Sequence, residues 1–450
     1  MEGRGNFGSR IGIVLATAGS AVGLGNVWRF PFMTGQNGGA AFILIYVVCV
    51  MLLGIPGMVS EFIVGRHSQA NAARAYAKFN GHRGWGAIGV LGIVTSMIIL
   101  GFYAVVAGWC LQYLGASVVG HLRGDKTYVL SYFQQFSQDP VRPAVLGVAF
   151  IVITQFIIVR GVRRGIERAS KLLMPLLLFL LLIIVTASCS LPGAWQGVEF
   201  LLKPDMGKVS SQTVLEALGQ AFFSLSLGTA CLCTYASYYS PQTRLLPSAV
   251  QIALVDSIIA ILAGLMIFPA AFSVGVQPDS GPALIFITLP NVFQQAFGSM
   301  PTVGYVVSIL FYALLVFAAL TSTISMHEIG TAFFHEELKL RRSHAAWILT
   351  VVCSLIAIAC SLSVGNSRIQ VMGLPLMDFC DTLTAQVMLP LGALLTSVLV
   401  GWCVNKSIVR NEFTNQETTS KRWFAAYFFL VRYVVPLCIM LILLHQFAII

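Results

Sequence analysis

The stretch TAGSAVGLGNVWRFP, residues 17–31, lies inside an apolar segment but contains residues that an ordinary membrane helix avoids. Glycine stands at positions 19, 23 and 25, and Asn26 and Arg29 follow. Glycines allow the backbone to leave the helix and allow other groups to approach it closely. The freed carbonyls could then coordinate a cation, and the amides that begin the next half-helix could bind an anion such as a carboxylate.

A packing role is the alternative for these glycines. Gly19 and Gly23 have the GxxxG spacing of a helix-packing face, membrane helices are rich in glycine, and Asn26 could hydrogen-bond to another helix. The glycines alone do not decide between packing and binding. Arg29 favours binding, because a charge within a membrane span is by default a sign of function.

A second apolar segment is interrupted in its middle by FFSLSLGTA, residues 222–230. Backbone that leaves a helix at membrane depth must find new hydrogen-bond partners, since each unsatisfied group costs several kcal/mol. The two interrupted segments stand five spans apart and therefore cross the membrane in opposite directions. Matching interrupted helices in two halves of a chain indicate an inverted-repeat transporter with its binding site near the bilayer midplane.

The composition supports a membrane protein with many spans. The chain is 57% hydrophobic and only 10% charged, whereas soluble domains are about 25% charged. A bilayer span needs about 20 mostly apolar residues, and the sequence offers about eleven such segments. They lie near residues 10–33, 40–65, 84–119, 143–160, 166–190, 213–240, 245–275, 303–336, 343–363, 372–404 and 423–448.

The expected fold is an all-α polytopic membrane protein that consists of two inverted five-helix repeats and an additional eleventh helix. The first and sixth helices are expected to be broken. No long polar linker divides the chain, so residues 1–450 are expected to form a single transmembrane transporter domain. Its first repeat would be 10–190, its second 213–404 and its additional helix 423–448.

The net charge of +10 does not indicate a nucleic-acid partner, because the basic residues alternate between loops as the positive-inside rule requires. Of the Lys and Arg residues in the loops, 19 fall in the set that includes the N-terminus and six in the opposite set. The N-terminus is therefore expected in the cytoplasm and the C-terminus outside. No small-residue cleavage site follows the first segment, so a removable signal peptide is not expected.

Several motifs resemble one family and follow in its order along nearly the whole chain. GSAVGLGNVWRFP, NGGAAFILIY and GIPGMVSEF come first, and RGIERASKLLMP, FFSLSLG, TYASY, FITLP and LTSTIS follow. These motifs resemble the neurotransmitter:sodium symporter family, and in particular its bacterial amino-acid transporters of the eleven-helix, leucine-transporter-like type. The resemblance implies sodium-coupled uptake by alternating access, in the plasma membrane of a prokaryote.

The resemblance implies two sodium sites built from hard oxygen ligands, as a desolvated alkali cation requires. The first would use the carbonyl of Ala21, the side chains of Asn26, Ser224 and Asp256, and the carboxylate of the substrate. The second would use the carbonyls of Gly19, Val22 and Ala318 and the hydroxyls of Thr321 and Ser322. Hydroxyls in LTSTIS could instead only bond back to the preceding helical turn.

Asp256 also indicates whether the protein requires chloride. Chloride-dependent relatives neutralise this region with a bound chloride ion, and an aspartate could supply the same negative charge covalently. Chloride is therefore not expected to be required.

The resemblance also implies where the substrate binds. Its carboxylate would lie near the amides of Leu24 and Gly25 and the hydroxyl of Tyr103. Its amine would meet the carbonyls of Ala21 and Phe223 and the hydroxyl of Ser226, with Ser224 close by. Its side chain would enter a pocket lined by Ile99, Phe223, Thr229, Ser322 and Met326.

Gly23 indicates the substrate class. Relatives that carry monoamines place an aspartate there, whereas glycine leaves room for a carboxylate on the substrate. We therefore expect a neutral α-amino acid that is hydrophobic or aromatic, although Thr229 and Ser322 leave a small polar side chain open. A symporter for another small amino compound is an alternative.

The resemblance implies two gates. Arg29 and Asp378 would form the extracellular pair, above a lid of Tyr103 and Phe223. Arg4 and Glu336 would form the intracellular pair. Phe7 replaces a tryptophan of the family near the N-terminus, which predicts a weaker cytoplasmic latch.

Glu61 and the charged stretch at residues 326–338 have structural explanations. Glu61 is expected to hydrogen-bond to the backbone of a broken helix. MHEIGTAFFHEEL, residues 326–338, is not expected to be a metal site, because His327 and His335 lie eight residues apart rather than four. A charged cytoplasmic end of a helix is the preferred explanation for it.

Other function classes explain the sequence less well. An ion channel would need a continuous polar pathway, and a membrane enzyme would need a nucleophile and base or a metal cluster, which we do not find. A sodium-dependent amino-acid sensor that does not transport would lose the gates or the second sodium site. The expected partners are a small amino acid and the lipid bilayer, and the oligomeric state is left open.

Overall fold

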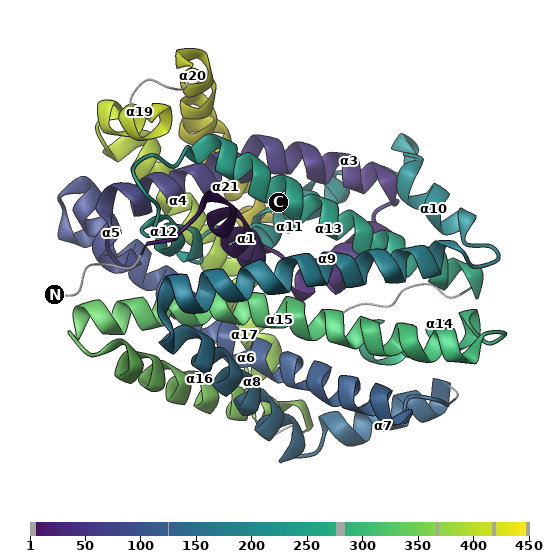
Figure 1. Ribbon diagram of the computed structural model, residues 1–450. Coiled ribbons are helices and arrows are strands. Elements are labelled where there is room, and N and C mark those ends of the chain that lie inside the picture. Colours follow the sequence, from purple (N-terminus) through teal and green to yellow (C-terminus); the bar gives the residue numbers. More distant parts are fainter. Residues whose placement is uncertain (1–5, 125, 276–283, 366–368, 416–419, 447–450) are drawn as a thin grey trace.

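The computed structural model describes residues 6–124, 126–275, 284–365, 369–415 and 420–446, and it consists almost entirely of helices (Figure 1). Within these residues, nine helices are long and apolar enough to cross a membrane, and a bent pair counts as a tenth. Nine of the predicted segments correspond to these continuous helices. A single cluster of buried apolar side chains extends along the chain from Phe7 to Ile442.

In the first half of the chain the continuous spans are α3 (Ala40–Cys49) with η2 (Val50–Gly54) and α4 (Ile55–Ser68), η3 (Arg83–Trp85) with α6 (Gly86–Val119), α8 (Arg142–Val159), and η4 (Val162–Glu167) with α9 (Arg168–Cys189). In the second half they are α13 (Leu245–Ser273), α15 (Pro301–Glu337), α16 (Arg342–Gly365), α17 (Leu376–Thr382) with η7 (Leu383–Met388), α18 (Leu389–Val398) and η8 (Leu399–Cys403), and α20 (Lys421–Phe429) with η9 (Leu430–Val434) and α21 (Val435–Gln446).

The first segment is broken, as predicted. Helix α1 (Arg10–Ala21) is followed by the π-helical turn η1 (Gly25–Arg29) and α2 (Phe30–Gln36), and the two halves are bent by 58°. Ser9 caps α1 by accepting a hydrogen bond from the Gly12 amide at 3.0 Å. The break therefore falls at residues 22–24, inside the glycine-rich stretch.

The sixth segment is broken as well. It consists of α11 (Ser211–Ser224) and the short α12 (Cys231–Ala236), with a non-helical turn between them. Ser226, Gly228 and Ala230 in this turn have positive φ angles of 52°, 81° and 61°, so the backbone departs strongly from a helix. A Cβ atom on Gly228 would collide with the carbonyl oxygen of Leu389, so only glycine fits this position.

The two breaks occupy the first and sixth positions that an inverted repeat requires, and the division into repeats and a single domain stays a prediction.

Shorter elements connect the spans, and the sequence analysis did not predict them. They are α5 (Ala72–Asn80), α7 (Lys126–Ser137), α10 (Trp195–Leu202), η5 (Met206–Lys208), η6 (Leu284–Thr288), α14 (Leu289–Ala296), α19 (Lys406–Thr414) and an antiparallel hairpin of β1 (Gln370–Val371) and β2 (Leu374–Pro375). Helices α5 and α19 lie at the end of the molecule where the N-terminus lies, and α10 and α14 lie at the opposite end (Figure 1).

Glu61, on α4, holds the broken sixth segment. Its carboxylate is buried and accepts hydrogen bonds from the amides of Gly228 at 2.8 Å and Cys233 at 3.4 Å. These amides belong to the turn and to the first turn of α12, whose N–H groups have no helical partner. The expectation that Glu61 binds the backbone of a broken helix is confirmed.

Replacing Glu61 by alanine should therefore destabilise the protein by about 1–3 kcal/mol, because two buried amides would lose their acceptor. Thermal unfolding of the purified protein in detergent measures the effect. Glu199→Ala is the matched control, since Glu199 is an exposed residue that only pairs with Lys203 on the same helix. Equal unfolding temperatures for the Glu61→Ala variant and the unmodified protein would contradict this role.

Candidate functional site

A cavity of about 410 Å³ lies between the two broken segments. This volume falls within the usual range for small-molecule sites. Its walls come from the α1–η1 break, the end of α11 and the turn that follows it, α6, α15, and the α17–η7 segment. Every residue expected to bind substrate lines it except Leu24: Ala21, Gly25, Ile99, Tyr103, Phe223, Ser224, Ser226, Thr229, Ser322 and Met326.

Leu24 contributes through its backbone. Its amide donates a hydrogen bond to the Tyr103 hydroxyl at 3.0 Å, which leaves the hydroxyl proton of Tyr103 available to a further acceptor. Gly23 lies beside this pair, and a Cβ atom there would stand 2.6 Å from Ser322 Oγ and 3.1 Å from Tyr103 Oη. This end of the cavity therefore presents hydrogen-bond donors around a space that no side chain at position 23 could share.

The turn of the sixth segment forms another wall of the cavity. Ser226 donates from its hydroxyl to the carbonyl of Ser20 at 3.3 Å, which connects the two broken segments directly. Thr229 donates to the carbonyl of Ser226 at 2.7 Å, and its own carbonyl accepts from Ser96 on α6 at 2.8 Å. The polar groups of this turn are thus fixed by neighbours on other helices.

Asp256, on α13, is the centre of a buried polar cluster. Its carboxylate accepts hydrogen bonds from Ser224 Oγ at 2.6 Å, Asn26 Nδ2 at 2.8 Å and Tyr46 Oη at 3.2 Å. All four side chains are almost fully buried. Asn26 also accepts from the Gly23 amide through Oδ1 at 3.2 Å. The structure therefore brings together the three side chains expected for the first sodium site and adds Tyr46, which the sequence analysis did not identify.

A second group of oxygen atoms lies where the α1 break meets α15. The carbonyl of Val22 accepts from Thr321 Oγ1 at 3.4 Å and from Ser322 Oγ at 3.3 Å, and Thr321 also donates to the Ala318 carbonyl at 2.9 Å. Gly19 lies against Thr321, because a Cβ on it would come within 3.4 Å of Thr321 Cβ. The residues expected for the second sodium site are therefore neighbours.

The Thr321 hydroxyl does bond back to the preceding helical turn, as the alternative interpretation predicted. The same hydroxyl also lies within hydrogen-bonding distance of the Val22 carbonyl in the break of the first segment.

The surroundings of Arg29 differ from the pair that was expected for the extracellular gate. The charged neighbours of Arg29 are Asp381 and Glu216, and its guanidinium lies 4.3 Å from the centre of the Phe223 ring. Asp378, which was expected to pair with Arg29, lines the cavity one helical turn away on α17. Residues three apart lie on the same side of a helix, so the choice between the two aspartates depends on how α17 is placed against η1.

The pair expected for the intracellular gate is described in part. Arg4 lies outside the described residues, and Glu336 accepts hydrogen bonds from the amide and side chain of Asn71 at 2.8 and 3.1 Å. Phe7 is largely buried among three tyrosine rings whose centres lie 5.9–6.3 Å away, those of Tyr235, Tyr238 and Tyr239. Phe7 thus packs against α12 and the residues that follow it.

The stretch at residues 326–338 is only partly a charged helix end. His327 and Glu328 are fully buried. His327 lies within hydrogen-bonding distance of Thr331 and Thr350, at 3.0 Å from each, and Glu328 is paired with Arg342. The expectation of a charged helix end is therefore wrong for the beginning of this stretch.

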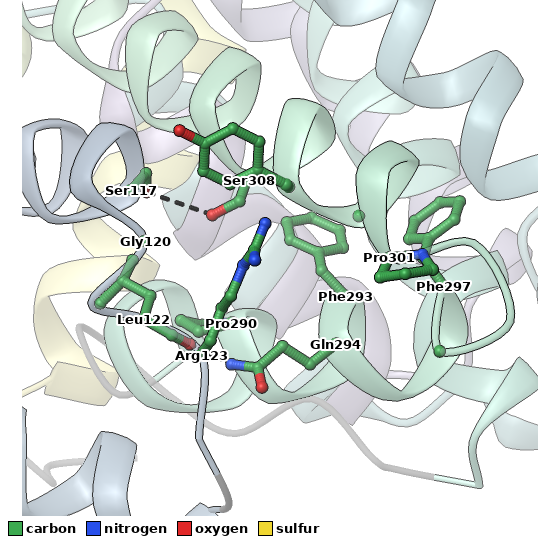
Figure 2. Close-up of a pocket in the computed structure, with 13 residues that line it drawn as sticks. Ser117, Gly120, Leu122, Arg123, Pro290, Phe293, Gln294, Phe297, Pro301 and Ser308 are labelled. Carbon is green, nitrogen blue, oxygen red and sulfur yellow. Dashed lines mark hydrogen bonds between the residues drawn. The ribbon is translucent and has the colours of Figure 1, made fainter.

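A second cavity, of about 280 Å³, lies between the end of α6, α14 and the start of α15 (Figure 2). Arg123 points into it toward Ser308 and Phe293 (Figure 2), and its guanidinium lies 4.6 Å from the centre of the Tyr305 ring. None of the residues expected for substrate, sodium or gates lines this cavity. The candidate site is therefore the larger cavity between the broken segments.

Comparisons with known proteins agree with this assignment. The model of the sodium:neurotransmitter symporter family matches residues 4–127 and 140–450. An uncharacterised sodium-dependent transporter of Bacillus subtilis (strain 168), YhdH, is 40% identical over 447 residues, which cover 98% of both chains. An uncharacterised sodium-dependent transporter of Haemophilus influenzae is 32% identical over 459 residues, again 98% of both chains.

A solved structure is similar over the whole fold. The crystal structure of MhsT in complex with L-phenylalanine superposes with a TM-score of 0.89 at 38% sequence identity, and the match covers 99% of this chain and 100% of MhsT. The fold, the broken helices and the order of the motifs thus have one explanation. The chain belongs to the sodium:neurotransmitter symporter family and is a sodium-dependent membrane transporter, not an enzyme.

Proposed function

We propose that this protein is a symporter that couples the uptake of a neutral, hydrophobic or aromatic α-amino acid to two sodium ions. The observation that carries the proposal is the mixed lining of the cavity. Its polar end presents the hydroxyl of Tyr103 beside Gly23, and its lining also includes the apolar side chains of Ile99, Phe223 and Met326. The structurally similar MhsT was crystallised with L-phenylalanine.

The polar end suits the carboxylate of an amino acid. The Tyr103 hydroxyl, whose oxygen accepts from the Leu24 amide, can donate its proton to it, and the backbone beyond the break adds the positive end of a half-helix. A carboxylate placed there lies next to Asn26 and Ser224, which belong to the Asp256 cluster. We infer that the substrate carboxylate completes the first sodium site, together with the carbonyl of Ala21.

Shared coordination couples the two ligands. If the same sodium ion touches both protein and substrate, each ligand strengthens the binding of the other by the same factor. Each charge moved across 100 mV supplies about 2.3 kcal/mol, so two sodium ions would supply about 4.6 kcal/mol. This energy would support a more than thousandfold accumulation of substrate even without a sodium concentration gradient.

Further roles follow from the same site. Asp256 supplies a fixed negative charge beside the first sodium ion, so we propose that chloride is not needed. The second ion would bind the carbonyls of Gly19, Val22 and Ala318 with the hydroxyls of Thr321 and Ser322.

We place the N-terminus in the cytoplasm and the C-terminus outside, because of the distribution of basic residues in the loops.

The competing function is a sodium-dependent sensor that binds an amino acid without transporting it. Arg29 has the acidic residues Asp381 and Glu216 near it, and the hydroxyls of Thr321 and Ser322 both donate to the Val22 carbonyl at the first break. A sensor would have no need of these parts, so transport is favoured.

Uptake into proteoliposomes tests the proposal. With an inward sodium gradient, L-phenylalanine should accumulate, and replacing sodium by potassium should abolish the accumulation. Replacing chloride by gluconate should leave it unchanged. Phenethylamine, which lacks only the carboxylate, should accumulate at least tenfold less, because the polar end of the cavity would have no partner. Sodium-dependent binding without accumulation would favour the sensor, and equal accumulation of phenethylamine would contradict the carboxylate assignment.

Replacing Gly23 by alanine should lower uptake by at least tenfold, because the new Cβ would occupy the space between Ser322 Oγ and Tyr103 Oη. Gly219→Ala is the matched control, since a Cβ at Gly219 meets no atom within 4 Å. Initial uptake rates and thermal unfolding are measured for both variants. Uptake by the Gly23→Ala variant at the rate of the unmodified protein would exclude this position from the site.

The two aspartates of α17 should differ in their effect on the gate. Asp381→Asn removes the acidic charge that acts most strongly on Arg29, so bound L-phenylalanine should dissociate about tenfold faster. Asp378→Asn is the control and should change the dissociation rate much less. The exchange of bound radiolabelled L-phenylalanine for unlabelled L-phenylalanine, followed over time, measures both dissociation rates. A larger effect of the Asp378→Asn variant would restore the pair expected from the sequence.

A further inference from the structure

Arg432, in η9, lies in a seam between two segments of the last spans. Its guanidinium is 4.4 Å from the centre of the Trp402 ring, in η8, and 5.6 Å from that of Tyr433. The Trp402 indole donates a hydrogen bond to the Arg432 carbonyl at 2.8 Å. Gly401 permits this close approach, because a Cβ on it would already stand 3.0 Å from Arg432 Cα.

The guanidinium of Arg432 has no anionic partner among the described residues. Its Nε atom is buried without a hydrogen-bond acceptor, and no ion pair or side-chain hydrogen bond joins its other N–H groups to the described part of the chain. A guanidinium carries five donors and cannot lose its charge, and buried donors without an acceptor are rare and costly. Because Arg432 as a whole is only half-buried, its terminal N–H groups are the ones that an acceptor from outside the protein could reach.

A second cation lies along the same seam. Lys406, at the start of α19, places Nζ 5.0 Å from the centre of the Phe428 ring, and Phe428 precedes Arg432 by one helical turn. Glu412, the acidic residue of α19, is engaged by Arg66 on α4. The described residues therefore provide two cations on aromatic rings here and no carboxylate that neutralises them.

The seam faces away from the protein. Trp402 and Tyr433 are 54% and 48% exposed, although both belong to helices that are apolar enough to cross a membrane. Tryptophan and tyrosine with this exposure are typical of the membrane–water interface. Trp402 lies at the end of its span, next to α19, and therefore at the end of the molecule where the N-terminus lies (Figure 1).

We propose that this seam binds the phosphate of a phospholipid with a net negative headgroup, such as phosphatidylglycerol. Arg432 would donate two parallel hydrogen bonds to the phosphate oxygens, a geometry that arginine forms readily. Lys406 would add a second positive charge. A zwitterionic lipid offers the same phosphate, but its cationic headgroup would face two cations, so an anionic lipid is preferred. This site is independent of the proposed transport function.

Native mass spectrometry of the purified protein tests the proposal with phosphatidylglycerol and phosphatidylcholine of identical acyl chains. Phosphatidylglycerol should bind about tenfold more tightly, and Arg432→Gln should remove this preference. Arg123→Gln is the matched control, because Arg123 also lies above a tyrosine ring but in the cavity beside α14. Equal binding of the two lipids, an unchanged preference in the Arg432→Gln variant, or an equal loss in the Arg123→Gln variant would overturn the proposal.

A fluorescence measurement keeps the proposal testable if the Arg432→Gln variant does not fold. The fluorescence of Trp402 is the signal that the Trp402→Phe variant lacks. Phosphatidylglycerol with brominated acyl chains should quench this fluorescence more than brominated phosphatidylcholine does. Soluble glycerol phosphate at millimolar concentration should not reverse this quenching. Equal quenching by both lipids, or full reversal by glycerol phosphate, would show that the seam does not select an anionic lipid.

Discussion

The structure depends on one constraint, which is that backbone amides and carbonyls freed at membrane depth must be satisfied. Both broken segments meet it with groups from other helices. The Glu61 carboxylate binds two amides of the sixth segment, the Tyr103 hydroxyl binds the Leu24 amide, and the hydroxyls of α15 face the Val22 carbonyl. These partners hold the breaks open, so that the cavity between them persists.

The same constraint explains why binding is concentrated here. Carbonyls that no longer bond within a helix can coordinate a cation, and amides at the start of a half-helix can bind a carboxylate. Asp256 and its donors sit beside these groups, buried on α13. In the proposed mechanism, the substrate carboxylate supplies an oxygen ligand to the sodium ion, and the ion supplies a positive charge beside the carboxylate. Ion and amino acid would therefore bind together.

Much of this arrangement could be predicted from the sequence, because it is encoded locally. Apolar runs marked the spans, glycines marked both breaks, and the motifs marked residues such as Asn26, Ser224 and Ser322 that the structure places around one cavity. The choice between Asp378 and Asp381 could not be made, since it depends on how one helix is rotated against another.

Other contacts were missed for the same reason. Tyr46 is distant from Asp256 in the sequence, and its hydrogen bond exists only because two helices meet. The burial of His327 beside Thr350 likewise depends on the packing of α15 against α16. A hydrophobic pattern indicates which segments are apolar, but it does not indicate which polar atoms of neighbouring helices face one another.

The most direct test is a pair of titrations of the purified protein. One measures the affinity for L-phenylalanine at several sodium concentrations, and the other measures the affinity for sodium at several phenylalanine concentrations. If the substrate carboxylate completes the first sodium site, each ligand should raise the affinity of the other by the same factor. Affinity for phenylalanine that does not change between sodium and potassium would contradict shared coordination.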